Sequence, residues 1–163
     1  MYTKNKLLII TLLLISNFSI AEEAPPAPTI SYEPLIVSEN DVGNIFNIQT
    51  RDMGGSAINY QSRAGVVNIM EQVVDDIDAT GYVAIEKVYK FYDKYQFIVS
   101  TGEYGMSCPA TTYAFTFDTK SESVTGKKQI DGCSENVDSF ADGNKLMVKK
   151  DGKPSTFYNG ETK

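Results

Sequence analysis

Apolar and polar side chains alternate through most of the second half of the chain, and this alternation is the strongest constraint on its fold. The run from Tyr82 to Tyr92 is the longest, and its apolar members on one predicted face are Val83, Ile85, Tyr89 and Phe91. Successive side chains of a strand point to opposite faces, so a period of two predicts a strand with one buried face.

Further alternating runs follow at short intervals. A two-residue connection predicted at Asp93-Lys94 leads to the next strand. The later runs carry Tyr95, Phe97 and Val99, then Tyr113, Phe115 and Phe117, a weak strand near Val124, and a closing hairpin of Leu146 and Val148 with Thr156 to Tyr158 around Asp151-Gly152. The connections are too short for crossover helices, so the strands should pair antiparallel. We therefore predict a mainly β fold: a single antiparallel β-sandwich-like or curled-sheet domain with at most one helix.

The first half of the mature chain carries weaker signals. Asn44 to Thr50 alternates in part and ends at a turn, residues 52–55, so Ala57 to Ser62 is its predicted hairpin partner. Residues 66–77 place apolar side chains on a helical stripe but are rich in β-branched residues, which favour strands. This segment is expected to be a helix or a mixed segment, and helix versus strand stays open.

The first 21 residues have the order of a secretory signal peptide. Lys4 and Lys6 precede the apolar run Leu7 to Ile15, and Ser19-Ile20-Ala21 offers small residues at a cleavage site. Residues 22–34 hold four of the six prolines and are predicted to form a linker. Residues 35–163 then form one β-rich domain, without a membrane span after cleavage, in the periplasm or outside the cell.

The chain is acidic, with a formal net charge of −6. Lys4 and Lys6 are the only charged residues of the predicted signal, so its removal changes the net charge to −8. Such a surface repels phosphates, which argues against nucleic acid as a partner. The same field favours a protein partner, in particular a basic one, and the oligomeric state is left open.

The two cysteines, Cys108 and Cys133, both lie in the predicted mature domain. An even number of cysteines in an oxidising compartment predicts a disulfide between them. Closing a loop of this length should stabilise the fold by about 3 kcal/mol. We expect the bond to be structural.

The chain contains no histidine. This excludes a Ser-His-Asp triad, a Cys-His dyad and the usual catalytic zinc sites, so we expect no enzyme, no catalytic residue and no cofactor. Asp76 to Gly81 begins like a calcium loop, but Lys87 stands where the bidentate glutamate belongs. We expect no metal site, and whether the cluster Asp75, Asp76 and Asp78 touches a cation stays open.

The segment from Thr101 to Ala110 is the main candidate for a binding element. It contains two glycines, and Cys108 with Pro109 fixes its far end. A rigid loop that presents Glu103 and Tyr104 would lose little entropy on association. Glu103 and Tyr104 are therefore the predicted partner-binding residues, and the alternative is a loop that only connects two strands.

The pattern Gly105-x-x-Cys108-Pro109-Ala110, followed by Gly132-Cys133, resembles one found in small exported bacterial β-rich proteins. Most members of that group are uncharacterised, and some resemble immunity proteins that neutralise toxins. The resemblance covers roughly residues 82–160. It implies a periplasmic binding protein, in particular an immunity protein that inhibits an interbacterial toxin by occluding its active site. A non-catalytic structural or accessory component of the cell envelope is the alternative.

Overall fold

The computed structural model describes residues 30–39, 41–51, 56–78, 80–103, 108 and 110–162. These residues form three antiparallel sheets that are not closed into a barrel. The predicted mainly β, antiparallel fold is confirmed. The predicted signal peptide and residues 22–29 of the predicted linker lie outside the described residues.

A central five-stranded sheet with the order β1-β6-β7-β8-β9 lies between two four-stranded sheets, β2-β3-β4-β5 and β10-β11-β12-β13. The bounds of the central strands are β1 Glu33–Pro34, β6 Thr80–Phe91, β7 Lys94–Glu103, β8 Thr111–Asp118 and β9 Ser123–Ile130. The first covering sheet comprises β2 Asp41–Val42, β3 Phe46–Thr50, β4 Ser56–Ser62 and β5 Gly65–Asn68, followed by the 3-10 helix η1 Ile69–Gln72. The second covering sheet comprises β10 Val137–Asp142, β11 Lys145–Lys150, β12 Lys153–Tyr158 and β13 Glu161–Thr162.

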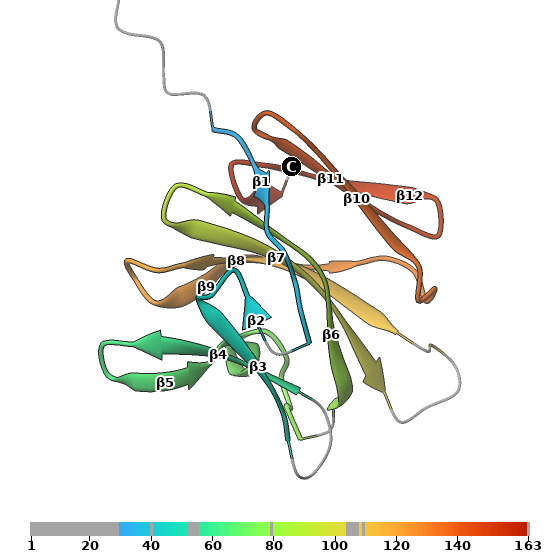
Figure 1. Ribbon diagram of the computed structural model, residues 1–163. Helices are drawn as coiled ribbons and strands as arrows, with labels where there is room; N and C mark the ends of the chain where they lie inside the picture. Colours follow the sequence, from blue (N-terminus) through green and yellow to red (C-terminus); the bar gives the residue numbers. More distant parts are fainter. Residues whose placement is uncertain are drawn as a thin grey trace, which may run out of the picture.

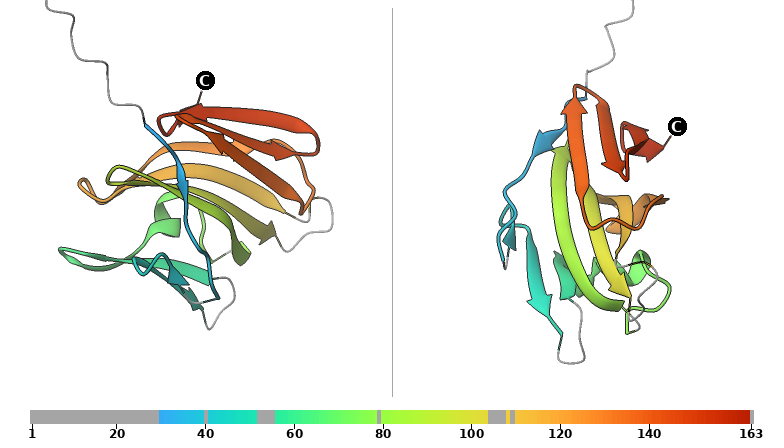
Figure 2. Two further views of the ribbon diagram at one scale, coloured as in Figure 1. Left: turned by 45° about the horizontal axis from the view of Figure 1, so that its top comes forward. Right: turned by 90° about the vertical axis from the view of Figure 1, so that its right-hand side faces the viewer.

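Each sheet is a meander of four consecutive strands, and β1 is added to one edge of the central meander (Figure 1). The left view of Figure 2 shows the three layers one above another, with β10–β13 at the top and β2–β5 at the bottom. Because every connection within a meander is a hairpin, strands that are neighbours in sequence are neighbours in space. The sequence order therefore translates directly into the order of the layers.

The first core lies between β2–β5 and the central sheet and is almost entirely apolar and aromatic. Its buried members are Val42, Phe46, Ile58, Ile69, Met70, Val73, Val83, Val88, Tyr95, Phe97, Val99, Phe115 and Phe117. Phe46 is at its centre, with ring centroids 4.9 Å from Phe97 and 5.0 Å from Tyr95. Phe97 stacks on Phe115 at 5.3 Å. These contacts confirm the predicted inward face of β7 and β8.

The second core lies between the central sheet and β10–β13 and mixes apolar with polar groups. Its buried hydrophobic members are Tyr32, Tyr89, Phe91, Ile98, Ala114, Ile130, Leu146, Val148 and Phe157. On the same side of β7 and β8 lie the buried polar side chains of Gln96, Ser100, Thr112 and Thr116. The central sheet is therefore buried on both faces, and its two faces differ in chemistry.

A β-bulge in β6 distributes this one strand over both cores. The register with β7 shifts between Ile85 and Lys87, where one extra residue is inserted. Val83 and Ile85 face the first core, whereas beyond the bulge Tyr89 and Phe91 face the second. The prediction that all four share one face is therefore wrong, because a bulge of one residue inverts the alternation that follows it.

The hairpin between β6 and β7 turns one residue earlier than predicted. Phe91 pairs with Lys94, so the two turn residues are Tyr92 and Asp93. Tyr92 has a φ of 53° and is 54 % exposed. Its aromatic ring extended the apparent apolar pattern of the strand, although the backbone already turns there.

Residues 66–77 form a mixed segment, one of the two outcomes left open above. Val66 and Val67 belong to β5, and the chain then enters η1, whose N-cap Asn68 accepts a hydrogen bond from the Met70 amide. Ile69 and Met70 are fully buried in the first core. The β-branched residues Val66 and Val67 thus lie in a strand, as their preference indicates. The apolar stripe that suggested a helix includes Met70, which is buried in the short 3-10 turn that follows.

The N-terminal end of the described chain crosses the edge of the central sheet (Figure 1). Glu33 and Pro34 pair with β6, Tyr32 is buried in the second core, and Leu35 packs against the first. The Tyr32 hydroxyl accepts a hydrogen bond of 2.7 Å from the Gly160 amide. Residues 30–34, the end of the predicted linker, are thus packed against the fold.

Gly160 allows the last turn of the chain to approach the central sheet closely. It has a φ of +81°, and a Cβ atom there would lie 2.7 Å from both the Phe91 ring and the Thr116 hydroxyl. The Thr116 hydroxyl oxygen lies 3.0 Å from the Gly160 carbonyl oxygen. A larger residue would push β12 and β13 away from this contact.

Candidate functional site

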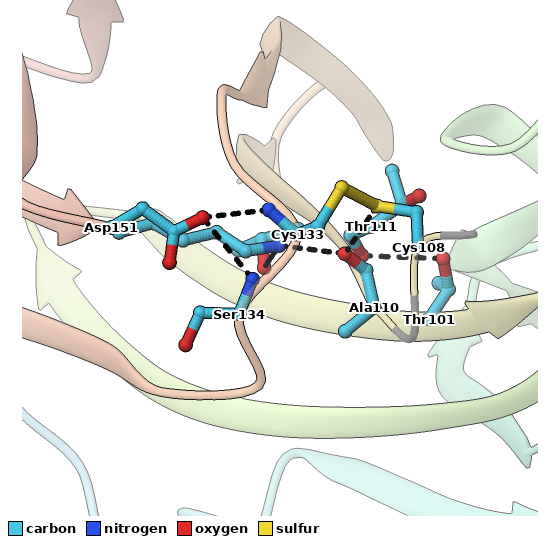
Figure 3. The surroundings of a disulfide bond; sticks show 9 residues. Thr101, Cys108, Ala110, Thr111, Cys133, Ser134 and Asp151 are labelled. Carbon is cyan, nitrogen blue, oxygen red and sulfur yellow. Dashed lines mark hydrogen bonds between the residues drawn. A yellow bond between two sulfur atoms is a disulfide. The ribbon is translucent and has the colours of Figure 1, made fainter. Parts of the chain in front are cut away.

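The predicted disulfide between Cys108 and Cys133 is present, with Cα atoms 4.9 Å apart. Cys108 precedes β8, and Cys133 lies in the connection from β9 to β10 (Figure 3). The bond therefore fixes the start of the second covering sheet to the end of the central sheet.

Lys150, at the end of β11, is fully buried beside this disulfide. Its ammonium group donates hydrogen bonds to the Ala110 carbonyl at 2.7 Å and to the Thr112 hydroxyl at 2.9 Å. Burial lowers the pKa of the Lys150 amine, because desolvation disfavours the charged form. Lys150 thus connects Ala110, two residues after Cys108, to the second covering sheet.

The hydroxyls of Ser100 and Thr112 lie 3.0 Å apart, and Thr112 also contacts the Lys150 amine. An amine with a lowered pKa beside hydroxyl groups is the arrangement that a Ser-Lys enzyme uses. Here both hydroxyls and the amine are buried between two sheets, so a substrate has no access to them. The arrangement satisfies buried polar groups and stabilises the interface between sheets.

Asp151 holds the other side of the disulfide connection. Its carboxylate accepts hydrogen bonds from the backbone amides of Cys133 at 2.8 Å and Ser134 at 3.3 Å, as Figure 3 shows. These two bonds lower the pKa of the Asp151 carboxyl. Thus the disulfide, Lys150 and Asp151 all fix the end of the molecule that carries the predicted binding loop.

The two predicted partner-binding residues are only partly placed. The backbone of Glu103 ends β7 and pairs with Thr80. The Glu103 side chain and the whole of Tyr104 lie outside the described residues. Their role therefore stays a prediction.

The acidic cluster considered for calcium is engaged with protein groups. Asp78 forms an ion pair with Arg51 at 2.6 Å, and the Asp78 amide donates to the Asp76 carboxylate at 3.0 Å. Within the described ranges, no three acidic or cysteine side chains form a cluster able to hold a metal ion. In the same part of the chain, no helix is long and apolar enough to cross a bilayer.

An exposed apolar area on the outer face of β10–β12 was not predicted from the sequence. Phe140 is 61 % exposed and pairs across the strands with Met147. A hollow of about 170 Å³ beside it is lined by Asp138, Ser139, Phe140, Met147, Lys149 and Pro154. We call this area the Phe140 face. The inward side chains of β10 are small or polar, so its sequence lacks the alternation that revealed the other strands.

A second hollow adjoins Phe140 on the side of β1 and β6. It measures about 240 Å³, and its lining includes Pro34, Lys87 and Tyr89. Tyr89 and Ser139 are joined there by a hydrogen bond of 2.8 Å between their hydroxyls. Phe140 thus projects between two hollows, which is the geometry of an anchor residue at a protein interface.

A third hollow lies on the opposite side of the molecule, on the outer face of β2–β5. It measures about 340 Å³ and is lined by Ile45, Asn47, Gln49, Asn59, Tyr60, Gln61 and Val66. None of these side chains carries a charge at neutral pH. We call this area the amide hollow.

Comparison with known proteins assigns this chain to no family: no family model, no curated protein and no solved structure matches it. The Phe140 face and the amide hollow differ in chemistry. The Phe140 face is apolar with charged neighbours, and the amide hollow is polar and uncharged.

Proposed function

We propose that this chain is an exported, non-catalytic binding protein that engages a protein partner through the Phe140 face. The observation that carries the proposal is a 61 % exposed phenylalanine beside a hollow that Met147 and Pro154 also line. Aromatic side chains that can insert into a partner's pocket dominate the energy of many interfaces. Burying Phe140 in a partner would also remove a solvent-exposed ring from water.

The partner we favour is a toxin with a basic surface, which makes the protein an immunity protein. Asp138 and Asp142 stand opposite Lys149 and Lys145, so the acidity that favours a basic partner is that of the whole chain, whose net charge is −6. Charge complementarity of this kind increases the rate of association. The loop with Glu103 and Tyr104 belongs to the same proposal, because Cys108 and Cys133 tie its end to the connection that leads into β10.

The disulfide supports export, since such bonds persist in oxidising compartments. A periplasmic or extracellular location agrees with the signal-like order of the first 21 residues. Blocking a toxin in that compartment needs a stable complementary surface and no chemistry of its own.

A photo-crosslinking amino acid placed at position 140 of the exported protein tests the proposal. The matched control carries the same amino acid at Ile36, which is 85 % exposed in the segment between β1 and β2. We expect one protein to be crosslinked from position 140 and not from position 36, and to be toxic when produced alone. Equal crosslinking from both positions, or none, would contradict a specific partner at the Phe140 face.

An accessory component of the cell envelope is the alternative, and the amide hollow favours it, because its uncharged polar lining suits an envelope polymer better than a basic toxin. Crosslinking from position 140 to envelope assemblies, without a toxic partner, would support this alternative.

A further inference from the structure

The amide hollow is built from one face of the first covering sheet. Asn47 pairs across the strands with Asn59, and Gln61 pairs with Val66, so these side chains share the outward face. The Asn59 amide nitrogen donates a hydrogen bond of 3.1 Å to the Gln49 side-chain oxygen. Four amide side chains from two adjacent strands therefore line one hollow of about 340 Å³.

Strand propensity does not explain why asparagine and glutamine occupy these four positions. Asparagine is depleted from strands, whereas threonine and valine fit an exposed strand position better. The opposite face of the same strands carries Phe46, Ile48 and Ile58, which follow the ordinary preference for a buried strand. The outward face thus departs from strand preference where the hollow lies, which is typical of residues kept for binding.

The lining determines the class of ligand. An amide group offers both hydrogen-bond donors and an acceptor, so it matches groups that do both, such as hydroxyls and other amides. The hollow has no charged lining residue, so it offers no counter-ion for a phosphate, a carboxylate or an ammonium group. Ile45 and Val66 bound it and are 38 % and 66 % exposed, so they can contact a methyl group or the apolar face of a ring.

We propose that the amide hollow binds a neutral, N-acetylated oligosaccharide. Such a chain presents hydroxyls and acetamido groups to the four amides, and its acetyl methyls to Ile45 and Val66. An extended peptide shares the amide chemistry, but proteins recognise peptide main chains mainly at sheet edges, where backbone groups are free to pair. The hollow lies on the outward face of β3 and β4, and its amide groups belong to side chains. This site uses a different sheet from the Phe140 face, so it does not depend on the protein partner.

Titration of the isotope-labelled full mature protein with chitotetraose, followed by NMR, tests the site. We expect shifts in the side-chain amide signals of Gln49, Asn59 and Gln61, and none in those of Gln96 in the second core. Absence of shifts at millimolar chitotetraose would overturn the proposal. Shifts of equal size with a neutral tetrapeptide would overturn it in favour of peptide binding.

The double variant Gln49→Ala with Gln61→Ala should weaken chitotetraose binding roughly tenfold, because two hydrogen-bonding groups are lost. Gln129→Ala is the matched control, since Gln129 is an exposed strand glutamine on β9, outside the hollow. It should leave the affinity unchanged. Equal affinities of the double variant and the control would overturn the site. The titration contains no protein partner, so its outcome does not depend on the proposed protein interface.

Discussion

The two faces of the central sheet are covered in different ways. In the first core, Phe46 packs against four aromatic rings, and the buried polar side chains on that face, those of Ser62, Thr101 and Thr111, lie at or near the ends of their strands. In the second core, a buried ammonium, an amide and several hydroxyls lie among the apolar side chains, and a disulfide closes one end. Hydrogen bonds on the side of the first covering sheet lie at the rim of its core, such as that from the Lys127 amine to the Val73 carbonyl, whereas the second core contains its polar groups within it.

The polar groups of the second core leave little freedom of arrangement. The Thr116 hydroxyl lies 2.9 Å from the Gln96 side-chain oxygen and 3.0 Å from the Gly160 carbonyl. A hydroxyl has one proton, so it can donate to only one of these two acceptors. If it donates to Gly160, the Gln96 amide must turn its nitrogen toward Thr116. Directional bonds of this kind fix the position of a sheet more narrowly than apolar contact does.

The substitution Phe46→Ala should have the largest effect on stability. It removes a fully buried ring that contacts Tyr60, Tyr95, Phe97 and Phe117, so we expect a loss of about 3–5 kcal/mol. Urea denaturation measures it, with Phe157→Ala as the counterpart in the second core. An equal or larger loss for Phe157→Ala would remove the proposed difference between the cores.

Replacing both Cys108 and Cys133 by serine should cost about 3 kcal/mol, because the unfolded chain regains the freedom of the closed loop. Because the bond acts through the unfolded chain, its loss should lower the stability of the whole fold. Hydrogen exchange is expected to accelerate in β3 and β4 as well as in β10–β12. Acceleration confined to β10–β12 would show that the second covering sheet opens on its own.

Lys150→Met should lower stability by about 1–2 kcal/mol at neutral pH, because the Ala110 carbonyl loses its charged donor. Burial lowers the pKa of the folded-state amine below its ordinary value of 10.5, so the unfolded state holds this proton more tightly. The contribution of Lys150 to the free energy of unfolding therefore rises with pH between its folded and unfolded pKa values.

The advantage of the wild type over Lys150→Met should accordingly grow as pH approaches 10.5. Burial raises the pKa of Tyr32 and Tyr95 above 10.0, so these phenols destabilise the fold at still higher pH. They are present in both proteins and cancel in the difference. A difference that is constant with pH would show that Lys150 is not desolvated.

Asp151→Asn should give the smallest effect. The two backbone amides that bind this carboxylate lower its pKa below 3.8 in the folded state. The contribution of Asp151 to folding stability is therefore fully present above the pKa of the unfolded state. It should be lost as pH falls through the folded pKa. The thermal midpoints of wild type and Asp151→Asn should therefore differ slightly at neutral pH and converge under strong acid. Ser155→Ala, on the neighbouring strand β12, should show no such convergence.

The sequence predicted the central strands well, because Tyr95, Phe97 and Val99 repeat a large apolar residue at every second position. The β6 bulge gave no signal, since inserting one residue leaves the local composition unchanged. Strand β10 was missed because its largest apolar residue, Phe140, faces outward, while Ser139 and Ala141 occupy inward positions. The pairing of Cys108 with Cys133 was predicted from their number alone.

The candidate sites were harder to predict than the fold. The Phe140 face and the amide hollow are each assembled by the cross-strand register of their own sheet. The sequence does not reveal this register until the turns and bulges are known. Lys150 resembles any surface lysine in the sequence, and only the close approach of β11 to the start of β8 buries it. The side chains of Glu103 and Tyr104 lie outside the described residues, so their predicted role stays a prediction.

The burial of the central sheet on both faces also has a thermodynamic consequence, which β6 illustrates. Val83 and Val88 belong to one core and Tyr89 and Phe91 to the other, so melting of either core withdraws this strand from both. The three layers should then behave as one cooperative unit, despite their different chemistry, with equal calorimetric and van't Hoff enthalpies of unfolding. Because β6 contributes side chains to both cores, neither core is expected to unfold without the other.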